Sequence, residues 1–279
     1  MSQALRADQA LVARGLAASR TAAQRLIDAA RVYYAGTETA VKKASEVVAS
    51  DEDLEVRAAA DGLPGEDRYV SRGGLKLAGA LAQTRLDVTG RVALDVGLST
   101  GGFADCLLQA GAARVVGVDV GHGQLHRRLA REPRLVSLEG INARHLSRET
   151  LDARLAQQAA EGGAQGEPAS TMAAVPEAGF DLIVGDVSFI SLTLVLPAVA
   201  PLLGATGDLL MLVKPQFEVG REHIGRGGLV RDAAQYAQVE TKIRAACETL
   251  GLTVAAWLDS PIAGGDGNRE FFVHATRAA

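Results

Sequence analysis

A glycine-rich segment that follows an apolar run is the part of this sequence best suited to hold a ligand. Residues 92–96 (VALDV) predict a buried strand containing Asp95, and glycines follow at Gly97, Gly101 and Gly102 before a predicted helix. Glycines at such a turn let the backbone amides of a helix N-terminus approach a ligand closely. Glycines after a strand can also be simple turn residues. The ordered set of strand, acid and three glycines favours a nucleotide-type cofactor.

The spacing of the glycines favours S-adenosylmethionine over a nicotinamide cofactor. The nicotinamide fingerprint has its second glycine two residues after the first, where this chain has Ser99. Asp95 would face an anionic diphosphate, but it could accept hydrogen bonds from a cationic ligand. A second predicted strand, 114–119, ends in Asp119, at the usual place for a carboxylate that binds ribose hydroxyls. Both cofactors would use Asp119, so it does not discriminate between them.

Three further charged residues stand at predicted strand ends. Asp186 follows the apolar residues 182–184, and Lys214 follows the apolar residues 209–213. Both would lie at carboxyl ends of adjacent parallel strands, where open α/β sheets bind ligands. Glu270 begins the last predicted strand and would start from the same edge if that strand is antiparallel. A single charge at a strand end is more often a solvated terminus, but several of them beside a cofactor loop predict an active site.

Alternating helices and strands must position these residues. We expect helices over 75–85 and 122–131, and strands near 92–96, 114–119, 135–139, 180–185, 208–213, 254–258 and 271–276. Such alternation predicts an α/β fold with a mostly parallel, Rossmann-like sheet covered by helices on both faces. Residues 157–179 are rich in Ala, Gly, Glu and Pro. We expect them to form a flexible surface insertion.

The first part of the chain predicts a separate small α+β unit. Two short helical patterns occupy residues 5–30, where Gly15 is a candidate C-terminal cap of the first helix and Ser19 a candidate N-cap of the second. Residues 32–34 and 46–49 are expected to pair as a hairpin. Acidic, turn-rich stretches follow at 51–53 and 61–67. The predicted domains are therefore 1–60 and 69–279, joined by a linker over 61–68.

Composition is that of an ordinary soluble protein. Of 279 residues, 22% are charged and 48% hydrophobic, and no apolar run approaches the ~18 residues that span a bilayer. Cys106 and Cys247 have neither metal-binding nor redox spacing, which favours a cytoplasmic setting. His122 and His126 are four residues apart but have no third ligand nearby, so we expect a surface pair and no metal.

Quoted together, these motifs resemble those of the TlyA family, whose members carry the names hemolysin and ribosomal RNA 2′-O-methyltransferase. The front resembles the RNA-binding domain named after small-subunit ribosomal protein four, at residues 6–8, 11, 15–20, 23, 27 and 32. The rest resembles the FtsJ-like methyltransferase domain, at residues 71–76, 95–103, 185–191, 213–218 and 268–271. The chain departs from the family pattern at Ala30, at Ala35 with Gly36, and at Leu98, whose side chain could crowd the methionine end of the cofactor.

The resemblance implies methyl transfer from S-adenosylmethionine to a ribose 2′-hydroxyl of ribosomal RNA, on a cytidine. It places a catalytic group on Lys76, Asp186, Lys214 and Glu270. Lys214 would face the hydroxyl, Asp186 would orient Lys214, and Glu270, or alternatively Glu218, would hold a lysine. A free lysine has a pKa near ~10.4. Lys214 must therefore either stabilise the alkoxide as a cation or have its pKa lowered by burial and a neighbouring cation.

The same resemblance implies contacts to the cofactor and to RNA. The cofactor loop would consist of Asp95, Gly97, Ser99, Gly101 and Gly102, with Asp119 at the ribose and Asn142 near the adenine. The net charge is −4, but residues 1–49 carry +3. Arg6, Arg20 and Arg25 would contact phosphates, and this small unit would recognise the shape of the RNA more than its bases. The alternative is that these charges form an ordinary solvated helical face that binds no RNA, since such a face would have the same net charge. An aromatic content of 4% argues against stacking on exposed rings as the main binding mode.

Two other functions compete with the enzyme. One is an RNA-binding ribosome assembly factor with a vestigial methyltransferase domain, which the intact Lys76, Asp186, Lys214 and Glu270 disfavour. The other is a membrane-acting hemolysin. That function needs an apolar span or a basic amphipathic helix with aromatic anchors, and the sequence predicts neither. The expected partners are ribosomal RNA or ribosomal subunits.

Overall fold

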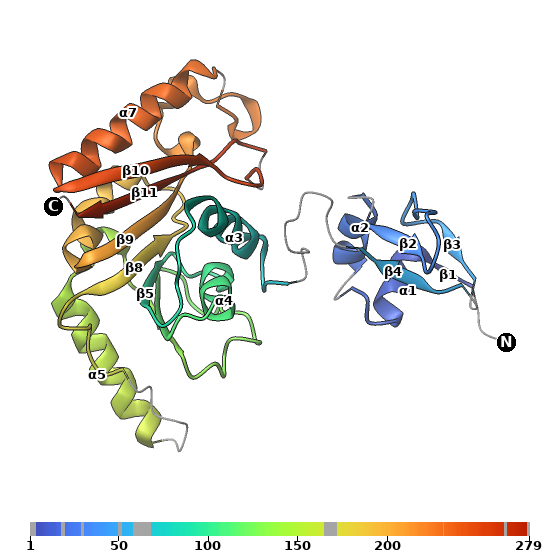
Figure 1. Cartoon of the computed structure of the whole chain (residues 1–279), viewed down its shortest axis with the longest axis horizontal. Coiled ribbons are helices and arrows are strands. Elements are labelled where there is room, and N and C mark those ends of the chain that lie inside the picture. Colours follow the sequence, from blue (N-terminus) through green and yellow to red (C-terminus); the bar gives the residue numbers. More distant parts are fainter. Residues whose placement is uncertain are drawn as a thin grey trace. The chain divides into compact units, whose positions relative to one another are not determined.

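The computed structural model describes residues 4–17, 20–28, 31–49, 52–57, 68–164, 172–230, 232–264 and 267–277. The chain divides into two compact units, Met1–Tyr69 and Val70–Ala279, which Figure 1 draws in blue and in teal to red. Most of the expected linker, 61–67, lies outside the described residues.

The smaller unit combines two helices with two pairs of short strands. Its elements are β1 (Leu5–Arg6), α1 (Ala7–Ala13), α2 (Arg20–Asp28), β2 (Val32–Tyr34), β3 (Val47–Val48) and β4 (Leu54–Val56). The expected cap Gly15 has a left-handed φ of 71° after α1, whereas Ser19 and Ala30 lie outside the described residues. Buried apolar residues of both helices and of β2, β3 and β4 form one core.

The expected hairpin between residues 32–34 and 46–49 is wrong. β2 pairs with β4, and β3 pairs with β1, both antiparallel. A tighter turn explains the difference. The amide of Tyr34 donates to the carbonyl of Thr39, and the amide of Val41 donates to the carbonyl of Val32, so residues 39–41 fill the edge of β2 that 46–49 would need.

A seven-stranded sheet organises the larger unit (Figure 1). Its strands are β5 (Val92–Val96), β6 (Arg114–Asp119), β7 (Leu135–Glu139), β8 (Phe180–Gly185), β9 (Leu203–Val213), β10 (Leu252–Asp259) and β11 (Phe271–Arg277). Their order is β10-β11-β9-β8-β5-β6-β7. The strands from β9 to β7 are parallel, and β11 runs antiparallel between β9 and β10. The predicted Rossmann-like α/β fold is therefore confirmed.

Helices and short 3₁₀ turns connect these strands. They are α3 (Arg72–Thr84), α4 (Gly102–Gln109), η1 (Ala143–His145), α5 (Arg148–Ala164), η2 (Leu192–Leu194), α6 (Leu196–Val199), η3 (Ala200–Leu202), η4 (Pro215–Phe217), η5 (Arg221–His223), η6 (Arg226–Gly228) and α7 (Ala234–Thr249). α3 and α4 pack against each other (Figure 1).

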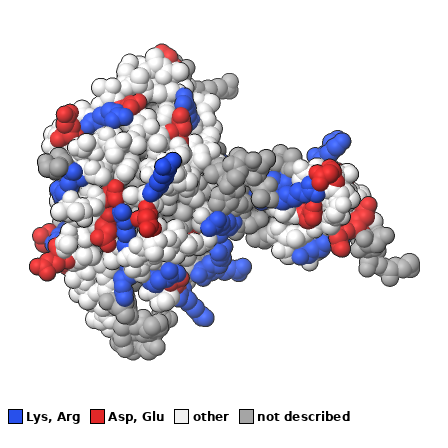
Figure 2. Space-filling view, in the orientation of Figure 1, with Lys and Arg blue, Asp and Glu red and all other residues white. Residues whose placement is uncertain are grey.

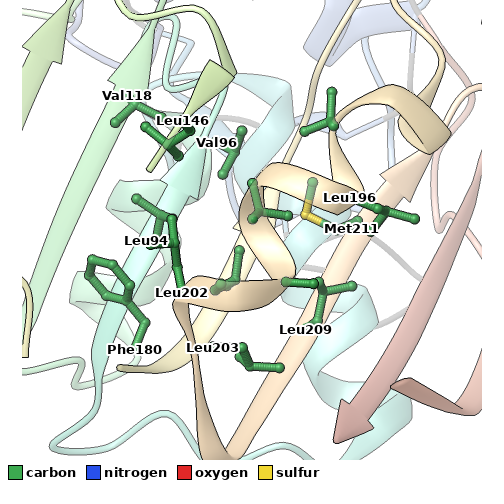
Figure 3. Close-up of a cluster of buried hydrophobic side chains, with 14 of the residues drawn as sticks. Leu94, Val96, Val118, Leu146, Phe180, Leu196, Leu202, Leu203, Leu209 and Met211 are labelled. Carbon is green, nitrogen blue, oxygen red and sulfur yellow. The ribbon is translucent and has the colours of Figure 1, made fainter. Parts of the chain in front are cut away.

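Strand alternation sorts the side chains of β5 between two faces. Leu94 and Val96 enter a large apolar cluster with Phe180 and Met211 (Figure 3). Asp95, between them, points to the opposite face, where the first turn of α4 lies: its carboxylate accepts a hydrogen bond from the amide of Ala104.

Two predictions of local structure differ from the observed chain. Residues 122–131 form bends and turns instead of a helix. Gly123 takes a left-handed φ of 65°, and after it the amides of Leu129 and Glu132 donate to the carbonyls of His126 and Leu129, which closes separate turns instead of the four-residue hydrogen bonds of an α-helix. Residues 157–164 of the expected flexible insertion continue α5. Their Ala, Gln and Glu residues favour helix, and α5 is anchored in the core by Leu151 and Leu155. Residues 165–171 lie outside the described part.

Candidate active site

The loop after β5 requires glycine at defined positions. Gly97 has φ of 87°, and a Cβ there would lie 2.8 Å from the carbonyl oxygen of Asp186. Gly101 has φ of 89°, and a Cβ there would collide with Leu129. Ser99 also adopts a left-handed φ, of 47°, which is costly for a residue with a side chain. The loop is thus held in a strained, specific shape against the loop after β8.

Asp119, at the end of β6, helps to fix that shape. One carboxylate oxygen accepts a hydrogen bond of 2.8 Å from the amide of Ser99, and the other accepts one of 2.7 Å from the amide of Gly121. Each oxygen of an ionised carboxylate has a second acceptor site. Asp119 can therefore accept further hydrogen bonds from a ligand.

A cavity of ≈ 530 Å³ opens above these loops and is lined by Gly97, Ser99, Val118, Asp119, Ile141 and Asn142, among others. Asn142 also accepts a hydrogen bond from the amide of Arg144 and so caps η1. An adjoining cavity of ≈ 160 Å³ is lined by Gly102, Leu98 and Lys214, among others. Gly101 lines neither cavity. Leu98 is 4% exposed, and its side chain fills the space above Gly117.

Asp95 differs from its expected position. Its side chain is fully buried and lines neither cavity. Burial, reinforced by the negative charges of Asp186 and Asp119, raises the pKa of Asp95 to about 8. The hydrogen bond from Ala104, 3.0 Å long, ties it to the first turn of α4. Asp95 thus supports the cofactor loop from beneath.

Two ion pairs form the centre of the site. Lys76 Nζ lies 2.6 Å from Glu270 Oε2, and both side chains are at most 10% exposed. Lys214 Nζ lies 2.5 Å from Asp186 Oδ1 and donates a hydrogen bond of 2.7 Å to Ser188 Oγ. Each lysine therefore has a defined carboxylate partner.

The antiparallel β11 brings Glu270 to this place. Phe271 stands opposite Val213 in the register of β11 and β9, so Glu270 and Lys214 emerge at the same edge of the sheet. Burial raises the pKa of Glu270, and the Lys76 ammonium only partly opposes that rise. The charged form of Glu270 is therefore stabilised mainly by the neighbouring Lys76 ammonium.

We call the cavities of ≈ 530 and ≈ 160 Å³ the glycine-loop cavities. The two ion pairs separate them from a third cavity, of ≈ 420 Å³. Lys76, Lys214 and Glu270 line this third cavity, and Asp186 and Lys214 line the smaller glycine-loop cavity. Ser188 lines all three cavities. A donor in the first cavity and an acceptor in the third would therefore meet beside Lys214. A fixed cation at that point can stabilise negative charge that develops on an acceptor oxygen.

Sequence reasoning missed Phe189. Its side chain is 90% exposed, its φ is 63°, and its ring centroid lies 5.2 Å from that of Phe217. Both rings line the third cavity. An exposed ring of this kind can stack on a nucleobase. The available signal was an aromatic residue in the loop that directly follows Asp186.

Asn268 begins the FtsJ-like motif at residues 268–271, and it shapes the wall of the third cavity. It is 2% exposed, accepts a hydrogen bond from the amide of Val230 and donates one to the carbonyl of Gly228. Glu218 does not line this cavity. Instead it accepts hydrogen bonds from Ser191 and Lys242 and so holds η2 against α7.

In the smaller unit, Arg6 and Arg20 share one acid. Arg6 Nε lies 3.1 Å from Asp8 Oδ1, and Arg20 Nη2 lies 2.8 Å from Asp8 Oδ2. Hydrogen bonds from Arg6 and then Arg20 lower the pKa of Asp8 to about 2. The two arginine side chains remain 45% and 60% exposed, so Asp8 fixes two guanidinium groups at the surface. The side chain of Arg25 lies outside the described residues.

The described residues contain no group of three side chains able to hold a metal ion. No helix in the described part of the chain is long and apolar enough to cross a membrane. Both cysteines are free and buried.

Comparison with known proteins identifies the family to which this chain belongs. Residues 69–277 match the family described as FtsJ-like methyltransferase. The chain is 40% identical over 269 residues to "Putative rRNA methyltransferase YqxC" of Bacillus subtilis (strain 168), covering 96% of this chain and 84% of that protein. It is 39% identical over 273 residues to the "16S/23S rRNA (cytidine-2'-O)-methyltransferase TlyA" of Mycobacterium tuberculosis (strain H37Rv), covering 98% and 90%. A solved structure described as "Putative hemolysin from Streptococcus thermophilus" matches with a TM-score of 0.67 and 35% identity, covering 99% of this chain and 89% of that one.

Proposed function

This chain belongs to the FtsJ-like methyltransferase family, and from that premise we propose that it transfers a methyl group from S-adenosylmethionine to the 2′-hydroxyl of a cytidine in ribosomal RNA. The observation that carries the proposal is the pair of lysine–carboxylate contacts between the glycine-loop cavities and the third cavity. The reaction class and the nucleic acid agree with the name of the related M. tuberculosis protein. Ribosomal RNA as the substrate implies work in the cytoplasm.

The residues present fit the cofactor. The cavity of ≈ 530 Å³ lies within the usual size range of small-molecule sites. Val118 and Ile141 give it apolar walls suited to a flat base, and Asp119 offers acceptor sites to ribose hydroxyls. Gly97 presents no side chain where the methionine portion must pass towards Asp186. When bound, S-adenosylmethionine supplies an electrophilic methyl group on a positively charged sulfur.

Lys214 performs the central step in this proposal. The bound cofactor would supply its methyl group to the 2′-oxygen, and the electron pair of the carbon–sulfur bond would remain on sulfur. Lys214 Nζ, fixed by Asp186 and Ser188, stabilises the negative charge that develops on the 2′-oxygen as the hydroxyl proton passes to solvent water. Lys76 and Glu270 form the opposite wall and keep the local charge balanced. Phe189 stacks on the base of the acceptor nucleotide.

The test uses ribosomal subunits that lack the modification. Purified protein is incubated with tritiated S-adenosylmethionine and each separated subunit, and label is located by nuclease digestion. We expect label in ribose on at least one subunit. Label on a base, or no label despite measured cofactor binding, would contradict the proposal and favour an assembly factor.

Lys214→Ala tests the assigned role. We expect turnover to fall by about 10²- to 10³-fold, as after loss of one oxyanion donor, while the cofactor Kd changes no more than a few-fold. Arg244→Ala, which removes a partly exposed cation paired with Glu240, is the control and should keep full turnover. Retained turnover in Lys214→Ala would remove Lys214 from this role.

A further inference from the structure

Positive charge in this chain gathers in two segments. Residues 1–49 carry +3, residues 121–148 carry +4, and the other 202 residues carry −11. The second segment lies in the acidic larger unit, so its excess cannot be a general property of that unit's surface. Figure 2 shows Lys and Arg atoms gathering below α4, where Figure 1 draws the green loops that follow β6.

The first half of this segment is fixed to the edge of the sheet that carries the active site. It begins where β6 ends, and Gln124 lines the cofactor cavity. The amide of His126 donates a hydrogen bond of 3.2 Å to the carbonyl of Thr100 in the glycine loop. Leu129 is 6% exposed and packs above Gly101. Buried apolar contacts therefore hold a loop whose charged side chains point outward.

Three of the arginines in this loop are exposed and have no ion-pair partner among the described residues: Arg127, Arg128 and Arg131. Arg134 provides the contrast. It contacts both carboxylate oxygens of Glu132, at 2.9 and 3.1 Å, and Glu132 is the only acid within residues 121–134. Three like charges within five residues repel one another, and the part of the chain that the structure describes supplies no carboxylate paired with any of them.

A polyanion would supply that counter-charge. Guanidinium groups match phosphate oxygens in bidentate geometry, and each phosphate contact releases counterions from RNA. The loop lies at the same edge of the sheet as the acceptor cavity, so an RNA that presents a nucleotide to Lys214 runs close to it. We propose that residues 122–134 form a second RNA-binding surface, on the methyltransferase unit itself, which contacts phosphates near the acceptor nucleotide. The choice of RNA rests on the proposed function.

The test is RNA binding without cofactor, so it does not depend on turnover. The probe is a short labelled RNA duplex of arbitrary sequence, titrated at several salt concentrations. The triple variant Arg127→Ala/Arg128→Ala/Arg131→Ala should bind about 10- to 100-fold more weakly at low salt. Its slope of log K against log salt should fall by about 2 to 3, since each lost phosphate contact removes about 0.9. S-adenosylmethionine affinity should stay within a few-fold.

The matched control removes three positive charges outside this loop, as Arg85→Ala/Arg244→Ala/Arg277→Ala, and should bind RNA as the parent does. Equal RNA affinity and equal salt slope in the two triple variants would overturn the proposal. So would loss of binding to vesicles of anionic phosphatidylglycerol with RNA binding intact, which would assign the surface to membranes. If RNA binding depends on the loop but no RNA is methylated, the surface stands and the proposed reaction fails.

A measurement on the unaltered protein tests the same surface even if the triple variant fails to fold. Phenylglyoxal modifies exposed arginines, and bound RNA should protect Arg127, Arg128 and Arg131 while leaving Arg85 reactive. Equal modification of the three arginines with and without RNA would refute the surface.

Discussion

Replacing Lys76 by methionine should make the stability of the larger unit strongly pH-dependent. The change leaves the Glu270 carboxylate, 3% exposed, without the cation that lies 2.6 Å away. At that distance the attraction is about 6 kcal/mol for an effective dielectric constant of about 20. Much of this offsets the cost of burying the two charges, and removing one partner of a buried pair typically costs about 3–5 kcal/mol.

The sign of the pH dependence follows from the carboxyl group. The pKa of Glu270 is already raised above its ordinary value of 4.5 by burial, and Lys76 is the largest influence that lowers it. Without Lys76 the folded-state pKa rises further. The stability linked to this carboxyl group is then present below pH 4.5 and is lost as pH rises through the folded-state pKa. We expect a loss of about 3–5 kcal/mol at pH 8.5, but only about 1 kcal/mol at pH 5, where the neutral acid needs no counter-charge.

Urea unfolding followed by tryptophan fluorescence measures this. Trp257 is the single tryptophan of the chain and stacks on Phe271, the residue after Glu270, at 5.4 Å, so the signal reports the larger unit alone. Lys76→Met/Glu270→Gln leaves no unpaired charge and should regain most of the loss at pH 8.5 while remaining inactive. Arg244→Met, at a partly exposed helical pair, should cost at most about 0.5 kcal/mol at either pH. An equal loss in Lys76→Met at both pH values, or less than about 1 kcal/mol at pH 8.5, would refute the reasoning.

Two further changes test other parts of the site. Phe189→Leu should lower kcat/KM for RNA about 5- to 150-fold, the equivalent of the 1–3 kcal/mol of one stacked base, while Phe189→Tyr keeps the ring and the activity; an unchanged kcat/KM in Phe189→Leu would exclude stacking. Asp95→Asn should raise the Tm increasingly from pH 5 to pH 8.5, because the pKa of Asp95 is raised from 3.8 to about 8 and the stability linked to its protonated form is lost as pH rises between those values; a Tm difference that stays constant with pH, measured by calorimetry, would contradict this.

The strands could be predicted from the sequence because each one is marked by a local run of apolar residues. The apolar runs ending at Asp186 and Lys214 each form the predicted strand, and the parallel order of β8 and β9 brings the two residues to one edge. Lys76 carried no such signal. It stands within a helical pattern, and only the packing of α3 and the return of β11 bring it to Glu270.

Other features depend on contacts that sequence patterns do not encode. Asp95 was expected at the ligand because it ends a strand before glycines, but strand alternation turns it to the buried face below α4. The helical spacing of residues 122–131 predicted a helix, because this pattern does not reveal that Gly123 takes a left-handed φ. Arg6 and Arg20 were expected to contact phosphates, and their spacing in the sequence did not reveal that Asp8 binds both.

The position of β11 has a consequence for the folding of the larger unit. This strand follows both β9 and β10 in the sequence, yet it lies between them in the sheet, and Glu270 directly precedes it. Strand β10 pairs with the sheet through β11, so β10 can join the sheet only when β11 has inserted beside β9. The same insertion brings Glu270 to Lys76, so the sheet and the wall of the third cavity are completed in one step.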